Sequence, residues 1–247
     1  MKLRFTLLTV VAVVVLSSLP AVSQSIGLAD SGAVAAAVEA ATTRYTKAIG
    51  DNSLLYTGPE YLDYNKPYMK GNQFFGLGKP QIGAVHYHGT LYTKVPLLYD
   101  MKLDQVVIQP PTNPLQFKLV DEHVKSFVID GHTFTRIIKD DTVRYSIPTG
   151  YYDLLVDGNA KVLAKRTKKT QTRRGLYGLE GSYLEEAKFY LQKNNEFHPV
   201  TSRQSIVRLL SDKKTALDSY ARQHRLQFKK ASQEASVIEL VKYYNSL

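Results

Sequence analysis

Two histidines and a run of cations are the residues whose types and spacing best suit a chemical role. His86 and His88 stand two apart in a segment that predicts a strand, so both rings would project from one face and could share a divalent metal ion. No third ligand follows them closely in the sequence, which makes them weak candidates for a metal site. We therefore expect neither a metal nor a cofactor.

Cations concentrate between residues 161 and 174. A flexible cationic arm can capture phosphate or carboxylate polymers by charge, with an affinity that falls as salt rises. The cations are expected to leave a strand and enter a loop that contains Gly175, Gly178 and Gly181. The alternative is a solvated hairpin tip without a ligand. The candidates for binding an anion are Lys165, Arg166, Lys168, Lys169, Arg173 and Arg174.

Patterns for catalysis are weak throughout the chain. There is no Gly-x-Ser-x-Gly, and the Ser-x-x-Lys match at Ser211 lacks its accompanying motifs, so Ser211 is expected to cap a helix. Paired carboxylates could serve a glycosidase only if they meet in space, and loop aspartates ordinarily make turns. We therefore predict that the protein is not an enzyme. The carboxylates concerned are Asp100, Asp104, Asp140 and Asp141.

A tyrosine-rich stretch contains Tyr56, Tyr61, Tyr64 and Tyr68. Tyrosine rings can stack on sugars or build an interface. Because the stretch links the first predicted helix to the first strand, we expect it to pack at the edge of the sheet.

The N-terminus has the pattern of a secretory signal peptide. Lys2 and Arg4 precede the apolar run Phe5–Leu16, and the small residues Ala21 and Ser23 offer a cleavage site that would remove residues 1–23. The run is too short to cross a bilayer, and no later segment is longer, so no transmembrane segment is expected after cleavage. The sequence thus predicts export to the periplasm, the cell surface or the exterior.

The composition is that of a globular, basic protein. The 247 residues are 44% hydrophobic and 22% charged, and the absence of Cys excludes disulfides, thiol catalysis and Cys-ligated zinc. The formal net charge of +10 falls to +8 without the signal peptide. This charge favours an anionic envelope polymer or another envelope protein as partner, and export argues against nucleic acid.

Three regions must position these residues. Ala33–Ile49 is rich in Ala and predicts a helix. From about residue 53 to residue 200, short strand-like runs are separated by turn dipeptides, among them Asp130-Gly131, Asp157-Gly158 and Asn194-Asn195. Beyond residue 200, apolar residues recur at helical spacing.

The C-terminal helices are expected to begin at identifiable caps. Thr201 and Gln204 match a capping box, and Ser232 is expected to cap the last helix. The predicted organisation is therefore a signal peptide (1–23), an N-terminal helix plus antiparallel β domain (24–200), and a helical segment (201–247) packed on the same domain. The fold class is α+β, with a mostly antiparallel meander forming a half-barrel or sandwich on which the N-terminal and C-terminal helices pack.

Several segments resemble a family of secreted Bacteroidota proteins with no known activity: Leu55–Tyr61, Gly71–Phe75, Val95–Asp100, Gly150–Leu155, Leu210–Lys214 and Tyr243–Asn245. The likeness covers most of the mature chain. It implies an exported, envelope-associated protein of a Gram-negative bacterium, and it transfers no catalytic or binding residue.

Three functional hypotheses follow. The first is a non-enzymatic binding or structural module of the envelope. The second is a periplasmic carrier of a lipid or another apolar ligand, which requires a lined internal cavity. The third is an envelope hydrolase, which requires the scattered carboxylates or His86 and His88 to converge in one cleft.

Overall fold

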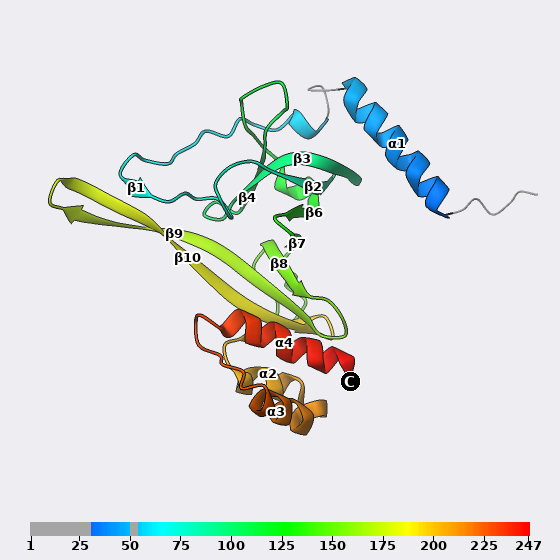
Figure 1. Ribbon diagram of the computed structural model, residues 1–247, viewed down its shortest axis with the longest axis vertical. Helices are drawn as coiled ribbons and strands as arrows, with labels where there is room; N and C mark the ends of the chain where they lie inside the picture. The colour runs from blue at the N-terminus through cyan, green and yellow to red at the C-terminus, as the bar shows by residue number, and fades with distance from the viewer. Residues whose placement is uncertain (1–30, 50–53) are drawn as a thin grey trace, which may run out of the picture. The chain divides into compact units, whose positions relative to one another are not determined.

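The computed structural model describes residues 31–49 and 54–247 (Figure 1). The chain divides into two compact units, residues 1–48 and 49–247. In the first, helix α1 (Ser31–Ile49) forms where the Ala-rich segment predicts it. The predicted signal peptide, residues 1–23, lies outside the described residues, and docking of α1 on the sheet stays a prediction.

The second unit is built on an 11-stranded sheet in the order β1-β10-β9-β8-β7-β6-β2-β3-β4-β5, with β11 also pairing with β10. All pairings are antiparallel except that of β1 with β10, and the sheet is not closed. The bounds are β1 (Met69–Lys70), β2 (Gln81–Tyr87), β3 (Thr90–Asp100), β4 (Gln105–Ile108), β5 (Phe117–Lys118), β6 (Val124–Ile129), β7 (His132–Ile137), β8 (Gly150–Val156), β9 (Lys161–Gly175), β10 (Gly178–Lys193) and β11 (Glu196–Val200).

The sheet consists of two meanders joined side by side. Strands β2 to β5 form one and β6 to β11 the other, and the pairing of β2 with β6 joins them. Short 3-10 turns occur at η2 (Leu54–Tyr56) and, on the connection between the meanders, at η3 (Asp121–His123). The predicted α+β class with a mainly antiparallel sheet is thus confirmed.

Two-residue turns occur where the sequence predicts them. Asp130 and Gly131 connect β6 to β7, and Asn194 and Asn195 connect β10 to β11, all four with positive φ. Positive φ at both central positions matches the right-handed twist of the strands. Asp157-Gly158 instead lies in a longer connection between β8 and β9.

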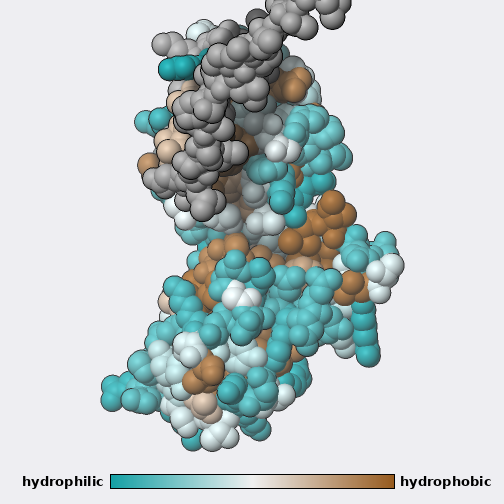
Figure 2. All heavy atoms as spheres, turned by 90° about the vertical axis from the view of Figure 1, so that its right-hand side faces the viewer, coloured by the Kyte–Doolittle hydropathy of each residue, from teal (hydrophilic) through white to brown (hydrophobic). Residues whose placement is uncertain are grey.

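Three C-terminal helices cover the end of the sheet formed by β8, β9 and β10 (Figure 1). They are α2 (Arg203–Leu209), α3 (Lys214–Gln223) and α4 (Gln233–Ser246), with η4 (Ser211–Lys213) between the first two. Leu217 and Leu240 are fully buried in one apolar cluster with Val162 and Leu191 of the strands. Outward-facing side chains of these helices are mostly hydrophilic (Figure 2). Among helices in the described ranges, none has the length and apolar content that a bilayer crossing requires.

The caps of these helices differ from the predicted ones. The N-cap of α2 is Ser202, not Thr201, because its hydroxyl accepts the Ser205 amide in a reciprocal capping box. Ser211 opens η4 without a side-chain cap. Ser232 holds the N-cap position of α4, but its hydroxyl donates to the Gln227 carbonyl instead.

The largest departure from prediction is the ribbon formed by β9 and β10. The loop expected to contain Gly175, Gly178 and Gly181 is instead paired strand, with a turn at Leu176 and Tyr177. Most side chains from residue 169 to the turn are exposed. A strand exposed on both faces carries no alternating apolar pattern, so the ribbon cannot be recognised from the sequence.

Candidate functional site

A pocket of about 280 Å³ opens where β1, the turn after β3 and the β9–β10 ribbon meet. We call it the Tyr–Lys pocket. Its volume is close to the lower end of the range for small-molecule sites, which suits one sugar residue or a headgroup. It is lined by Tyr64, Lys66, Tyr68, Met69, Lys102, Thr170, Thr172 and Tyr183.

A glycine allows β1 to form one wall of this pocket. Met69 lies opposite Gly181 in the parallel pairing of β1 with β10, and the Gly181 amide donates to the Tyr68 carbonyl at 3.0 Å. A Cβ at position 181 would come within 2.2 Å of Met69 Sδ. Glycine at this position therefore lets the segment that carries Lys66 and Tyr68 lie against the ribbon.

Two of the three tyrosines that line the pocket are held in place, Tyr64 by a buried carboxylate and Tyr183 by an amide. Asp100 is fully buried and accepts hydrogen bonds from the hydroxyls of Tyr61 and Tyr64, each at 2.8 Å. On the opposite wall, the Tyr183 hydroxyl donates to Asn65 Oδ1 at 3.2 Å. Rings fixed in this way present preorganised aromatic surfaces, which reduces the entropy lost on binding.

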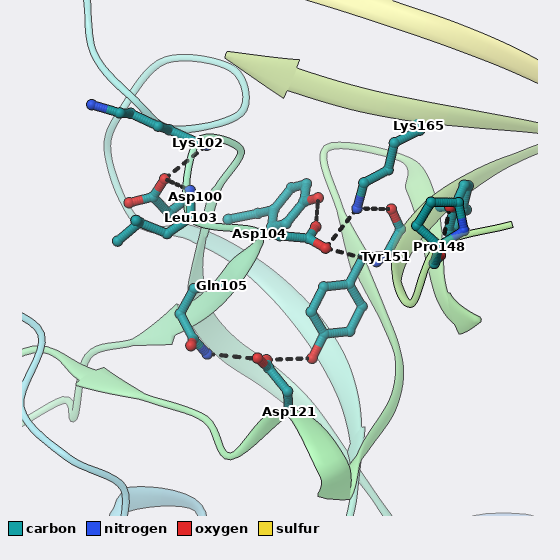
Figure 3. A network of polar contacts seen from close by, with 11 residues as sticks. Asp100, Lys102, Leu103, Asp104, Gln105, Asp121, Pro148, Tyr151 and Lys165 are labelled. Atoms are coloured by element: carbon teal, nitrogen blue, oxygen red, sulfur yellow. Dashed lines mark hydrogen bonds and ion pairs between the residues drawn. The ribbon is translucent and has the colours of Figure 1, made fainter. Parts of the chain in front are cut away.

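The same carboxylate orients Lys102. Asp100 Oδ1 accepts the amides of Lys102 and Leu103, each at 2.9 Å, which fixes the turn after β3. Figure 3 shows the Lys102 side chain pointing away from Asp104, whereas Lys165 points toward it. The Lys102 ammonium lies 5.3 Å from the centre of the Tyr64 ring and lines the pocket.

The charged side chains of the pocket lining are two lysines, and the carboxylates of Asp63 and Asp100 act on its tyrosines from outside the lining. Lys66 and Lys102 are exposed, no described carboxylate forms an ion pair with either, and the lining contains no Asp or Glu. Burial raises the pKa of the Tyr64 hydroxyl well above its usual value, and the hydrogen bond to Asp100 raises it further. Burial likewise raises the pKa of Tyr183. Both rings therefore stay neutral while the lysines carry positive charge, an arrangement that favours an anion bearing a ring or apolar face.

Most of the predicted cationic cluster is engaged within the protein. Lys165 donates to Asp104 at 2.6 Å, and Lys168 donates to the Phe74 carbonyl. Arg166 is buried, where it bonds Asp153 and Glu234, each at 2.7 Å. These three cations connect β9 to other parts of the fold: the turn after β3, the segment before β2, and strand β8 with helix α4.

The outer cations of the cluster are the exposed ones. Lys169 pairs with Glu186 at 2.7 Å, and Arg173 pairs with Glu180 at 3.0 Å. Arg174 is exposed near the ribbon turn. The six candidate cations therefore do not lie together on a flexible arm. A second pocket, of about 290 Å³, contains Arg173, Glu180 and Lys70.

The two histidines do not share a strand face. Strand β2 ends at Tyr87, and His88 sits in the turn with φ of +48°, where its ring stacks on His123 with centroids 3.7 Å apart. His86 lies in β2 opposite Ser126, with its Nδ1 buried. The prediction that both rings project from one strand face is wrong, because the strand ends before His88 and side chains no longer alternate between faces there. In the part of the chain that the structure describes, no group of three or more acidic or histidine side chains could hold a metal ion.

The carboxylates considered for a hydrolase do not converge, because each one bonds to a different partner. Asp104 accepts from Lys165 and from the Tyr99 hydroxyl, and Asp100 holds the tyrosines described above. In the loop after β7, Asp140 accepts from Thr142, and Asp141 pairs with Lys139.

One polar group that sequence patterns did not single out is a chain of ionisable residues from β7 to α4. His132 Nδ1 lies 2.8 Å from Asp153 Oδ2, Asp153 is buried, and Arg166 connects it to Glu234. The His132 side chain is about one third exposed, at 36%. A carboxylate that accepts from Nδ1 leaves Nε2 available as a base. No sequence pattern predicts this pair, because partners 21 residues apart on two strands meet only through the register of β7 with β8.

No protein-family model, no curated protein and no solved structure matches this chain. The functional conclusions therefore rest on the sequence and on the geometry of these sites.

Proposed function

We propose that this protein is an exported, non-enzymatic binding module of the bacterial cell envelope, and that the Tyr–Lys pocket takes an acidic sugar residue of an anionic envelope polymer. The observation that carries the proposal is the pairing of fixed, neutral tyrosine rings with two exposed lysines around one pocket. Rings that stack on a sugar face, together with ammonium groups that bind its carboxylate or phosphate, supply the two contacts such a ligand needs.

Export is supported by the signal-peptide pattern of residues 1–23 and by the resemblance to secreted Bacteroidota proteins. The net positive charge supports an anionic partner, because it raises the local concentration of a polyanion and speeds encounter.

A direct test is binding of a short oligogalacturonide, measured by isothermal titration calorimetry. Its fully methyl-esterified form is the matched control, because it keeps the sugar rings and removes the charges. The proposal expects saturable binding of the acid form, weaker binding at high salt, and little binding of the ester. Loss of one charge-assisted hydrogen bond in Lys102→Ala should weaken binding about tenfold. The matched variant Lys125→Ala, an exposed lysine on β6, should leave it unchanged.

Equal binding of acid and ester, or equal loss in Lys102→Ala and Lys125→Ala, would refute the pocket as an anion site. Absence of binding to any acidic oligosaccharide, across carboxylated and phosphorylated forms, would refute the proposed ligand class.

A second candidate function, the envelope hydrolase, is favoured by one specific observation, the His132–Asp153 pair. A histidine oriented by a buried carboxylate can act as a general acid or base. Incubation with ester, glycoside and peptide substrates tests this candidate, with His132→Asn as the control. Turnover that disappears in His132→Asn would establish the hydrolase and overturn the non-enzymatic proposal.

The carrier hypothesis lacks comparable support. It requires a lined apolar cavity, whereas the Tyr–Lys pocket is lined by hydroxyl and ammonium groups as well as by rings. The apolar centre of the sheet holds packed rings, such as Phe127 stacked on Phe134 at 4.9 Å.

A further inference from the structure

The tip of the β9–β10 ribbon exposes two large apolar side chains. Leu176 is 87% exposed and Tyr177 is 96% exposed, and Leu179 beside them is 47% exposed. The pairing of β8 with β9 reaches only Ala164, so the outer part of the ribbon extends beyond β8 (Figure 1). Leu176 and Tyr177 are the most exposed large apolar side chains among the described residues.

Cations surround this apolar tip. The outer ribbon carries Lys169, Arg173 and Arg174; Lys169 pairs with Glu186 and Arg173 with Glu180, which leaves Arg174 as the cation in excess. The Arg173 side chain is 79% exposed, and Arg174 lies opposite Leu179 in the pairing of the two strands. An apolar tip bordered by excess positive charge is complementary to a surface with an apolar interior and anionic headgroups.

We propose that the ribbon tip inserts Leu176 and Tyr177 into the headgroup region of an anionic lipid bilayer, while Arg173 and Arg174 bind lipid phosphates. Tyrosine favours the membrane–water interface because its ring is apolar and its hydroxyl is polar. Basic residues near an anionic leaflet each add to the affinity. The backbone near the turn is already paired, from Gly175 with Gly178 inward, so shallow insertion leaves few unpaired amides in the membrane.

This contact is independent of the Tyr–Lys pocket. The lysines that line the pocket, Lys66 and Lys102, come from segments other than the ribbon tip. A Lys66→Ala/Lys102→Ala variant should therefore lose the oligosaccharide and keep the membrane, so failure of one proposal does not imply failure of the other.

The absence of Trp from the chain gives a sensitive test. Tyr177→Trp places the sole tryptophan at the tip, and Leu77→Trp places it at another exposed position, 83% exposed. With vesicles containing phosphatidylglycerol, the Tyr177→Trp emission should shift to the blue and be quenched by lipids brominated on the acyl chain. The Leu77→Trp emission should stay unchanged.

Vesicle flotation then measures how much the apolar side chains and the arginine each contribute to membrane affinity. Leu176→Asp/Tyr177→Asp should weaken binding about thirtyfold, because two apolar side chains lose their burial. The matched variant Leu77→Asp should bind as the parent does. Arg174→Gln should weaken binding about fivefold, with Lys125→Gln as its control.

Three results would overturn the proposal. The first is a Tyr177→Trp emission that does not respond to anionic vesicles. The second is equal binding to vesicles of phosphatidylcholine alone, which would remove the role of the arginines. The third is a blue shift without vesicles that grows with protein concentration, which would identify a second copy of the chain as the occupant of the tip.

Discussion

The buried ion pair between Asp153 and Arg166 makes a quantitative prediction about stability. The Asp153 side chain is 1% exposed and the Arg166 side chain 9% exposed, and Asp153 Oδ2 lies 2.7 Å from Arg166 Nε. Removing one partner leaves the other with a single, partly exposed partner, His132 beside Asp153 or Glu234 beside Arg166, so most of the compensation for the buried charge is lost. Replacing both by apolar side chains removes the charge and its desolvation cost together.

The magnitudes follow from this burial. Asp153→Leu and Arg166→Met should each lower the free energy of unfolding by about 3–5 kcal/mol, the usual cost of breaking a buried pair from one side. The double variant should lose less than either single variant. Glu234→Gln should cost only about 0.2–1 kcal/mol, because the Glu234 side chain is 36% exposed and its pair with Arg166 is screened by water.

Urea denaturation followed by far-UV circular dichroism measures all four variants against the parent protein. The cycle isolates the coupling between the two residues, and Glu234→Gln controls for loss of charge at the solvent end of the same network. A double variant that loses more than either single variant would refute the argument, since removing the second charge would then bring no relief of the desolvation cost of the first.

Two further predictions concern the network in Figure 3. A Cβ at Gly150, where φ is +154°, would lie 2.3 Å from Asp104 Oδ2, so Gly150→Ala should separate Asp104 from Lys165 and cost about 1–3 kcal/mol. An unchanged urea midpoint would contradict this. Burial raises the pKa of Asp121 above its ordinary value, and the hydrogen bond from Tyr151 only partly opposes this. The folded carboxyl then resists ionisation more than the unfolded one, so stability is lost as pH rises from the unfolded pKa to the folded pKa. Asp121→Asn should therefore gain stability relative to the parent as the pH rises above the ordinary carboxyl pKa of about 4, and the reverse trend in urea midpoints would sink the argument.

Much of the fold could be predicted from local sequence. Turn residues such as Asp130-Gly131 and Asn194-Asn195 tolerate positive φ, so the hairpins that they connect follow from the residues themselves, although Asp157-Gly158 shows that the dipeptide alone does not fix the turn. The C-terminal helices can likewise be predicted, because the spacing of their apolar residues is a local property of the sequence.

The candidate site could be predicted only in part. Tyr64 and Tyr68 were singled out as rings able to stack on sugars, but we expected them to serve packing. Lys66, Lys102 and Tyr183 carried no signal. Lys66 and Tyr183 are brought together by a parallel pairing of only two residues in each strand, Met69 and Lys70 with Gly181 and Ser182, and Lys102 comes from the turn after β3 that Asp100 holds. Such a short pairing has no recognisable pattern in the sequence.

The sequence by itself determined an α+β chain of hairpins and amphipathic helices, its excess of positive charge and its predicted export signal. Turn geometry, helical periodicity and net charge depend on residues that are neighbours in the chain or on simple counts. Only the tertiary structure decided which cations remain free to bind. Lys165 and Arg166 lie only four and three residues before the exposed Lys169, yet they are neutralised by Asp104, Asp153 and Glu234 from distant segments. The availability of a charge depends on what is packed against it, and local sequence does not predict how distant segments pack together.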